Sequence, residues 1–296
     1  MTLSKGTLFP SVLITDVINN VTGKSSLVKL SRQTPIAFNG NEVFTFSMDN
    51  EIDVVAENAP KSHGGVSLTP QKVAPIKVEY GARVSDEFMY ASQEARISIL
   101  RPFVEGFAAK LARGLDIMAM HGINPRTGTA SEVIGSNHFD AKVEQTVAYN
   151  ADDPDANIQA AIDLIQAEEK DVNGLALAPA LSAALANYKV NGVKQFPEYA
   201  WGQVPEATNG LRVDVNSTVS YGDSEDRAIV GDFANKFRWG YAKQIPMEVI
   251  EYGDPDNTGA DLKGHNQVYI RCEAYLGWGI LDGAAFARIT ETSTGA

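Results

Sequence analysis

The most regular hydrophobic pattern of the chain lies between residues 92 and 122. Apolar side chains recur there every three or four positions, at Ile97, Leu100, Val104, Phe107, Leu111, Leu115 and Met118. This spacing predicts a long helix with one continuous apolar stripe. Pro102 lies inside the pattern, so we expect either a kink or a second helix beginning there. Gly122, followed closely by Pro125, is expected to end the helix.

Alternating apolar and polar residues predict two strands before this helix, over 42–48 and 73–84. The segment between them, 57–65, is polar and rich in residues that break regular structure. We therefore expect a long two-stranded flap with its tip near 57–65. The first 35 residues have no clear period and form either a frayed terminus or an arm that packs on another molecule.

The second half of the chain alternates helical and strand patterns. Residues 124–153 are turn-rich and are expected to link two subdomains. Helices are predicted over 155–169 and 180–188, with strands over 175–178, 211–215, 228–230, 237–241 and 247–251, and a closing strand or strand plus helix over 267–287. This alternation indicates a mixed α/β or α+β module.

Composition narrows the functional classes. The 296 residues carry 37 acidic and 25 basic side chains, a net charge of −12, which excludes a generally basic nucleic-acid binder. The single cysteine, Cys272, cannot form an intramolecular disulfide, so we expect an intracellular protein. No apolar run is long enough to span a bilayer, and no signal peptide is recognisable.

Conventional catalysis finds no support in the sequence. The histidines are scattered, without the spacing of a helix-borne metal site, at His63, His121, His138 and His265. Phosphate-binding, dinucleotide-binding and serine-nucleophile motifs are absent from the sequence. Cys272 is expected to be a small buried apolar side chain rather than a nucleophile. We expect no cofactor and no metal.

Two further patterns suggest binding but favour simpler interpretations. Residues at the first, third, fifth and sixth places of a calcium loop are Asp254, Asp256, Thr258 and Gly259. The twelfth place holds His265 instead of glutamate, so a polar surface turn is expected. Tyr199 and Trp201 could stack on bases, but without neighbouring arginine or lysine they are expected in a core or an interface.

The order of these parts resembles a known family. Its segments, in order, are similar to 42–45, 53–61, 84–89, 116–122, 175–179, 231–233, 266–273 and 285–286. Together they resemble the major capsid protein of tailed bacteriophages, of the Hong Kong 97 type, over nearly the whole chain. The resemblance implies an α+β fold of that type. Its parts would be an N-terminal arm (1–36), an extended loop that is a β-hairpin (37–85), a peripheral domain with a long spine helix (86–150), a mixed α/β axial domain (151–245), and return strands of the peripheral domain with a C-terminal axial segment (246–296).

The same resemblance implies a structural protein without enzyme activity, which assembles into an icosahedral head around double-stranded DNA. Its partners would be its own copies in hexamers and pentamers, portal and scaffolding proteins, decoration proteins, and DNA enclosed without sequence specificity, but no membrane. It would assemble in the bacterial cytoplasm and reside in the virion. Because the chain begins with Met1 at the arm, we expect a separate scaffold. Assembly contacts are expected at Phe9, Glu57, Lys61, His63 and Trp201.

One family member joins its subunits by an isopeptide bond between lysine and asparagine, aided by a glutamate. Lys61, Asn266 and Glu273 match these roles by position, although 63–65 departs from that member's more acidic loop tip. Two other functions stay open at this stage. One is an encapsulin-type nanocompartment shell, whose members have a shorter flap, and the other is a soluble α/β enzyme with an unrecognised site.

Overall fold

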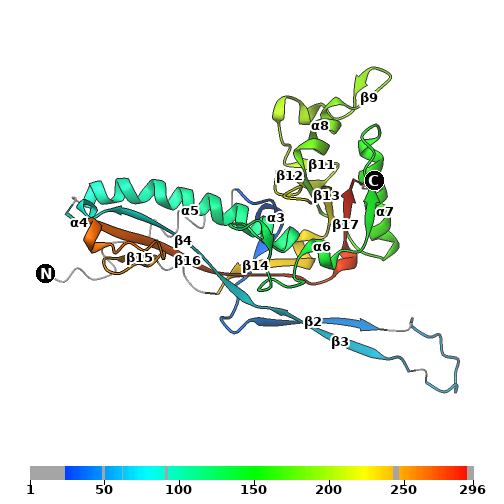
Figure 1. Ribbon diagram of the computed structural model, residues 1–296. Helices are drawn as coiled ribbons and strands as arrows, with labels where there is room; N and C mark the ends of the chain where they lie inside the picture. Colours follow the sequence, from blue (N-terminus) through cyan, green and yellow to red (C-terminus); the bar gives the residue numbers. More distant parts are fainter. Residues whose placement is uncertain (1–23, 49–50, 62, 91–92, 243–246, 292–296) are drawn as a thin grey trace.

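The computed structural model describes residues 24–48, 51–61, 63–90, 93–242 and 247–291. Its three parts are a helix on a sheet, a projecting hairpin and an α/β domain (Figure 1). In the first part, α5 (Gln93–His121) lies along the paired strands β4 (Pro75–Ser85) and β16 (Gln267–Ile280). The hairpin of β2 (Asn41–Met48) and β3 (Val66–Val73) extends away from both other parts.

Helix α5 confirms the helix predicted from the apolar stripe. It runs uninterrupted through Pro102, so a second helix beginning there is wrong. Its apolar face is buried in a core shared with a five-stranded sheet, whose strand order is β1 (Arg32–Gln33), β14 (Phe237–Tyr241), β16 and β15 (Met247–Ile250), with β4 also on β16. At its end, the Gly122 amide donates to the Met118 carbonyl at 3.0 Å. Gly122 has φ +67, and an added Cβ would lie 2.5 Å from His138, so glycine is required there.

The predicted pairing of the flap is wrong in one strand. The partner of β2 is β3, with Phe44 opposite Pro70, whereas the predicted strand 73–84 is β4, which pairs with β16 over its length. Pro70 and the polar residues around it concealed β3 in the sequence. Among the described strands β3 pairs only with β2, and a proline is tolerated in a strand that has one free edge.

The α/β domain is built on a six-stranded sheet of mixed direction. Two predicted helices are confirmed as α7 (Pro154–Ala167) and α8 (Pro179–Asn187), which pack on this sheet around a second apolar core. The strand order is β11 (Ala207–Thr208), β12 (Leu211–Val215), β8 (Gly174–Leu177), β13 (Asp226–Gly231), β17 (Phe286–Thr290) and β7 (Thr146–Ala148). The α/β character predicted for this region is therefore confirmed.

The segment expected to be only a linker contributes to both parts. It contains β7, at the edge of the six-stranded sheet, and α6 (Phe139–Lys142). Phe139 is fully buried against three rings from distant parts of the chain, Phe233, Phe237 and Phe286. Short elements and buried single residues leave little periodicity, which is why the sequence showed only turns here. Residues 267–287, predicted as one closing element, are likewise divided between the two sheets. Strand β16 ends at Ile280, and β17 belongs to the six-stranded sheet.

Candidate assembly surfaces

The β2–β3 hairpin has one apolar face. In its antiparallel register Phe44 lies opposite Pro70 and Met48 opposite Val66, and directly opposed residues share a face. Four side chains of this face, Phe44, Met48, Val66 and Leu68, are 58–71% exposed. Single exposed apolar residues are common on proteins, but a contiguous stripe of them marks an interaction surface.

The base of the hairpin is fixed to its own subunit. The Lys142 ammonium donates to the Gln71 side-chain carbonyl at 3.0 Å, and the Thr45 hydroxyl donates to the Leu281 carbonyl at 3.4 Å. Burial lowers the pKa of Lys142. Because Gln71 faces Val43 across the hairpin, this contact uses the face opposite to the apolar one. The apolar stripe therefore stays directed away from the contact that holds the hairpin.

Beyond β2 the chain runs as an exposed extended segment, 51–61, in which Ile52 and Val54 are almost fully accessible. Three predicted assembly residues lie in or beside this segment and are exposed, namely Glu57, Lys61 and His63. The fourth, Phe9, lies outside the described residues. Whether these residues form contacts between subunits stays a prediction.

The outer end of the α/β domain carries the fifth predicted contact. Trp201 is 98% exposed and has φ +62, a left-handed conformation that is costly for a bulky residue. It borders a hollow of about 490 Å³ between α8 and the 3₁₀ segment Pro197–Gly202. Tyr199 belongs instead to the core, where it is buried and shares a hydrogen bond of 2.7 Å with the Thr208 hydroxyl.

The three residues predicted for cross-linking are not brought together within one chain. Asn266 is exposed just before β16, and Glu273 lies seven residues later, so extended backbone separates them by about 20 Å. The Glu273 carboxylate pairs with Lys77 at 2.7 Å and with Arg271 at 3.3 Å. Lys61 is on the exposed segment beyond the hairpin. A shared site would therefore require residues from different copies.

Asp116 of α5 holds two other parts of the chain, residues 25–27 and residues 216–218, by hydrogen bonds to its side chain. This fully buried carboxylate accepts hydrogen bonds from the Ser25 hydroxyl, the Ser26 and Leu27 amides at 3.0 and 3.3 Å, the Asn216 amide at 3.2 Å and the Thr218 hydroxyl at 3.1 Å. Burial raises the pKa of Asp116 to about 6, against these hydrogen bonds. The start of the short helix α3 (Ser26–Leu30) and the 216–218 loop are thus joined to the long helix at one residue.

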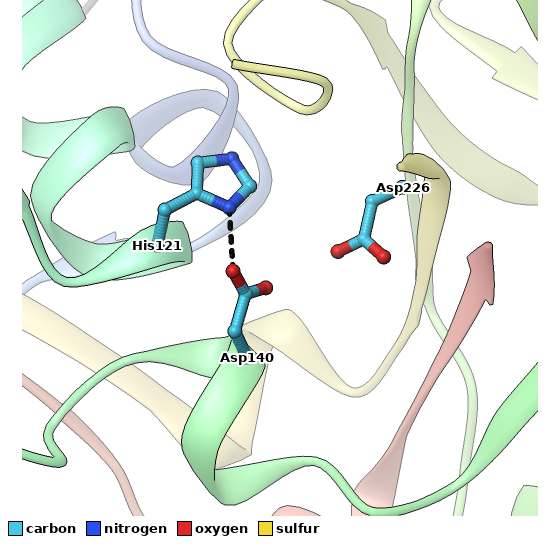
Figure 2. Close-up of side chains that lie close together, drawn as sticks. All are labelled: His121, Asp140 and Asp226. Carbon is cyan, nitrogen blue, oxygen red and sulfur yellow. Dashed lines mark hydrogen bonds and ion pairs between the residues drawn. The ribbon is translucent and has the colours of Figure 1, made fainter. Parts of the chain in front are cut away.

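A second charged group lies one helical turn further, between α5 and the six-stranded sheet. His121 Nδ1 is 2.8 Å from an Asp140 oxygen, and Asp226 faces the same space (Figure 2). Arg288 donates to Asp140 at 2.8 Å and to Asp226 at 3.2 Å. Burial opposes a charged His121, but the hydrogen bond to Asp140 raises its pKa; burial also raises the pKa of Asp226. The sequence held no signal for this group, because its members are far apart along the chain.

The segment that mimics a calcium loop is occupied by an arginine. Arg83 of β4 donates to Asp254 at 2.6 Å, to Asp256 at 3.0 Å and to the Thr258 hydroxyl at 2.6 Å. The guanidinium thus sits where the carboxylates would meet a metal ion, and the prediction of a polar surface turn is consistent with this arrangement. Cys272 is buried, as predicted, and burial raises the pKa of its thiol to about 12, which disfavours the reactive thiolate.

Known proteins match most of the chain. A family model described as "Phage capsid family" matches residues 5–290. A solved chain of Mycobacterium phage Ogopogo has 30% sequence identity and a TM-score of 0.78, covering 91% of this chain and 92% of its own. A chain of Gordonia phage Cozz has 26% identity and a TM-score of 0.76, covering 91% and 87%.

A more distant structure has the same fold. It belongs to the "capsid of native GTA particle computed with C5 symmetry", with 14% identity and a TM-score of 0.63, covering 90% of each chain. No match was found among the curated proteins. Within the described ranges, no helix combines the length and hydropathy needed to cross a membrane.

Proposed function

The chain belongs to the phage capsid family and is a structural protein of a phage head, and from this premise we propose that the apolar face of its β2–β3 hairpin overlaps a second copy in the shell. The single observation that carries the proposal is the stripe of Phe44, Met48, Val66 and Leu68, exposed on a hairpin whose opposite face is already anchored. Two-stranded hairpins are marginal in water unless something packs on them.

Several modest contacts of this kind would add up around each copy. One hairpin buries too little surface for a stable pair by itself, but a copy inside a closed shell both gives and receives such a contact. Simultaneous engagement multiplies the small contributions. The exposed Trp201 at the outer end of the α/β domain supports a second contact, between axial domains arranged in hexamers and pentamers. Closed rings require contacts of this head-to-tail kind.

The enclosed molecule and the further partners belong to the same proposal. A net charge of −12 suits a container for double-stranded DNA, since a strongly basic wall would retain the genome by releasing its counterions. We propose portal, scaffolding and decoration proteins as partners on the family resemblance alone. Neither the nanocompartment shell nor the soluble enzyme is proposed further, because the family model that matches the chain is that of the phage capsid family and both named solved chains come from phages.

Covalent cross-linking between Lys61 and Asn266, assisted by Glu273, stays a prediction. It requires the lysine amine of one copy to attack the asparagine carboxamide of another and release ammonia, while the glutamate accepts a proton. The test is a denaturing gel of mature particles after boiling in detergent. Cross-linking predicts a ladder of multiples, whereas a single band near 31.9 kDa would rule it out.

The hairpin contact can be tested by thiol labelling, because the native Cys272 is buried and should not react with the label. We would introduce Leu68→Cys and compare its labelling rate in free subunits and in assembled shells. The proposal predicts at least about tenfold slower labelling in the shell, and equal rates would overturn it. Val133→Cys, an exposed position outside the hairpin, reports whether the reagent reaches the shell surface.

A further inference from the structure

Three potential metal ligands converge where the long helix meets the α/β domain. They are His121 at the end of α5, Asp140 in α6 and Asp226 at the start of β13 (Figure 2). One ligand atom from each lies within 4.8 Å of the other two. Among the described residues, this is the one group of three such side chains that lie close enough together to hold a metal ion. His121 and Asp226 are buried, so the group differs from the exposed acidic clusters that are common on protein surfaces.

The hydrogen bonds around His121 orient it as a metal ligand. Its Nε2 lies 2.8 Å from the Thr218 carbonyl, which can only accept, so Nε2 carries a hydrogen. Nδ1 is the nitrogen directed at Asp140, 2.8 Å from its carboxylate oxygen. Histidines that bind metals commonly donate their other ring nitrogen to a backbone carbonyl in this way, which fixes the ring and its tautomer.

The carboxylates are supported in a corresponding manner. Asp140 directs one oxygen at His121 and accepts a hydrogen bond from Arg288 at 2.8 Å on the other. Arg288 also approaches Asp226, at 3.2 and 3.4 Å from its two oxygens. For Asp140, such an outer hydrogen bond to the oxygen that does not face the ion is a usual feature of metal sites. The guanidinium also balances the charge of two carboxylates in a buried position.

Two of the three residues border a hollow that opens to solvent, and the third, Asp226, is buried behind it. A hollow of about 490 Å³ is lined by His121 and Asp140 together with Tyr221, Asp223 and Ser224. It gives an entry path and room for water molecules to complete the coordination. Asp223, exposed at its rim, adds negative charge that attracts a cation.

We propose that His121, Asp140 and Asp226 bind one divalent transition-metal ion of the zinc class. One imidazole nitrogen with two carboxylates suits zinc, cobalt or manganese, whereas calcium and magnesium prefer oxygen ligands alone. The ion would take the place of the proton on His121 Nδ1, which leaves to solvent. It would join the long helix to the α/β domain, a bracing role beyond the assembly contacts proposed above.

The test uses the full-length chain, stripped with a chelator and dialysed against zinc chloride. We expect about one bound zinc per chain, and an affinity at least about tenfold lower in His121→Asn and in Asp226→Asn. The matched control is His265→Asn, an exposed histidine on the 3₁₀ turn before β16, which should bind as the wild type does. Circular dichroism without metal establishes that each variant is folded.

A second measurement covers the case in which a variant fails to fold. The visible spectrum of cobalt-loaded wild-type protein reports its ligands, and we expect bands of nitrogen and oxygen coordination without sulfur-to-metal charge transfer. The proposal is overturned if wild-type protein binds no zinc, if folded His121→Asn keeps wild-type affinity, or if a sulfur band assigns the ion to Cys272.

Discussion

Removing the apolar face of the hairpin should weaken assembly without unfolding the subunit. In the double variant Phe44→Ser, Leu68→Ser, the side chains that are replaced are 58% and 60% exposed in the single copy. Complete burial of such a side chain contributes about 1.5–3 kcal/mol. If a neighbour covers the exposed part, each hairpin contact loses about 2–3.5 kcal/mol, or about 30- to 300-fold in its association constant.

The assay is sedimentation velocity over a series of protein concentrations, with electron microscopy of the products. Where a scaffold is needed, it is present at the same concentration for every variant. The double variant should need a much higher concentration to form shells, while the thermal unfolding of its free subunit changes little, since surface substitutions usually stay within about 0.5 kcal/mol. Val133→Ser removes exposed apolar surface elsewhere and should assemble normally. If the double variant assembles at the wild-type concentration, the hairpin face is not the contact.

Four further outcomes follow from the structure. Asp116→Ala leaves five donors, four of them buried, without their acceptor and should lower the free energy of unfolding by at least about 3 kcal/mol in urea titrations, so a loss below about 1 kcal/mol would contradict the anchor role. Because burial raises the pKa of Asp116 to about 6 from 3.8, the folded chain holds a proton that the unfolded chain releases between these values. The free energy of unfolding of the wild type, relative to that of Asp116→Asn, should therefore fall as pH rises from about 4 to about 6. A difference between the two proteins that does not change with pH would refute the raised pKa. The fluorescence of Trp201, which is exposed in the single copy, should become protected from quenching by acrylamide on assembly, and Trp201→Phe should lack this change. Unchanged quenching in shells would show that Trp201 is not in a contact between subunits. Cys272 should react with a thiol reagent at pH 8 only after unfolding, and fast labelling of the native subunit would show that it is accessible.

The sequence predicted the elements whose patterns are long and regular. The apolar stripe from Ile97 to Met118 is sustained over many turns, and α5 follows it almost residue for residue. The prediction failed where the partner of a strand lies far away along the chain. Strand β4 has the same alternation as a hairpin strand, but its partner is β16, almost two hundred residues away, while Pro70 disguised the real hairpin partner β3.

The charged sites could not be predicted for a related reason. His121, Asp140 and Asp226 come from three elements and meet only when the helix docks on the sheet, so no spacing along the chain signals them. The acidic segment after residue 253 did look like a cation loop. The sequence could not show that its cation is the guanidinium of Arg83, because that side chain arrives from β4.

Helix α5 lies along the paired strands β4 and β16, an arrangement that should resist bending (Figure 1). A single residue, Ala74, separates the end of β3 from the start of β4. A closed shell is not equally curved everywhere, since its corners bend more sharply than its facets. If α5 and its strands resist bending, the change of angle between neighbours falls on the slender hairpin beyond its anchored base, so stiffening the hairpin should restrict the sizes of shell that can close.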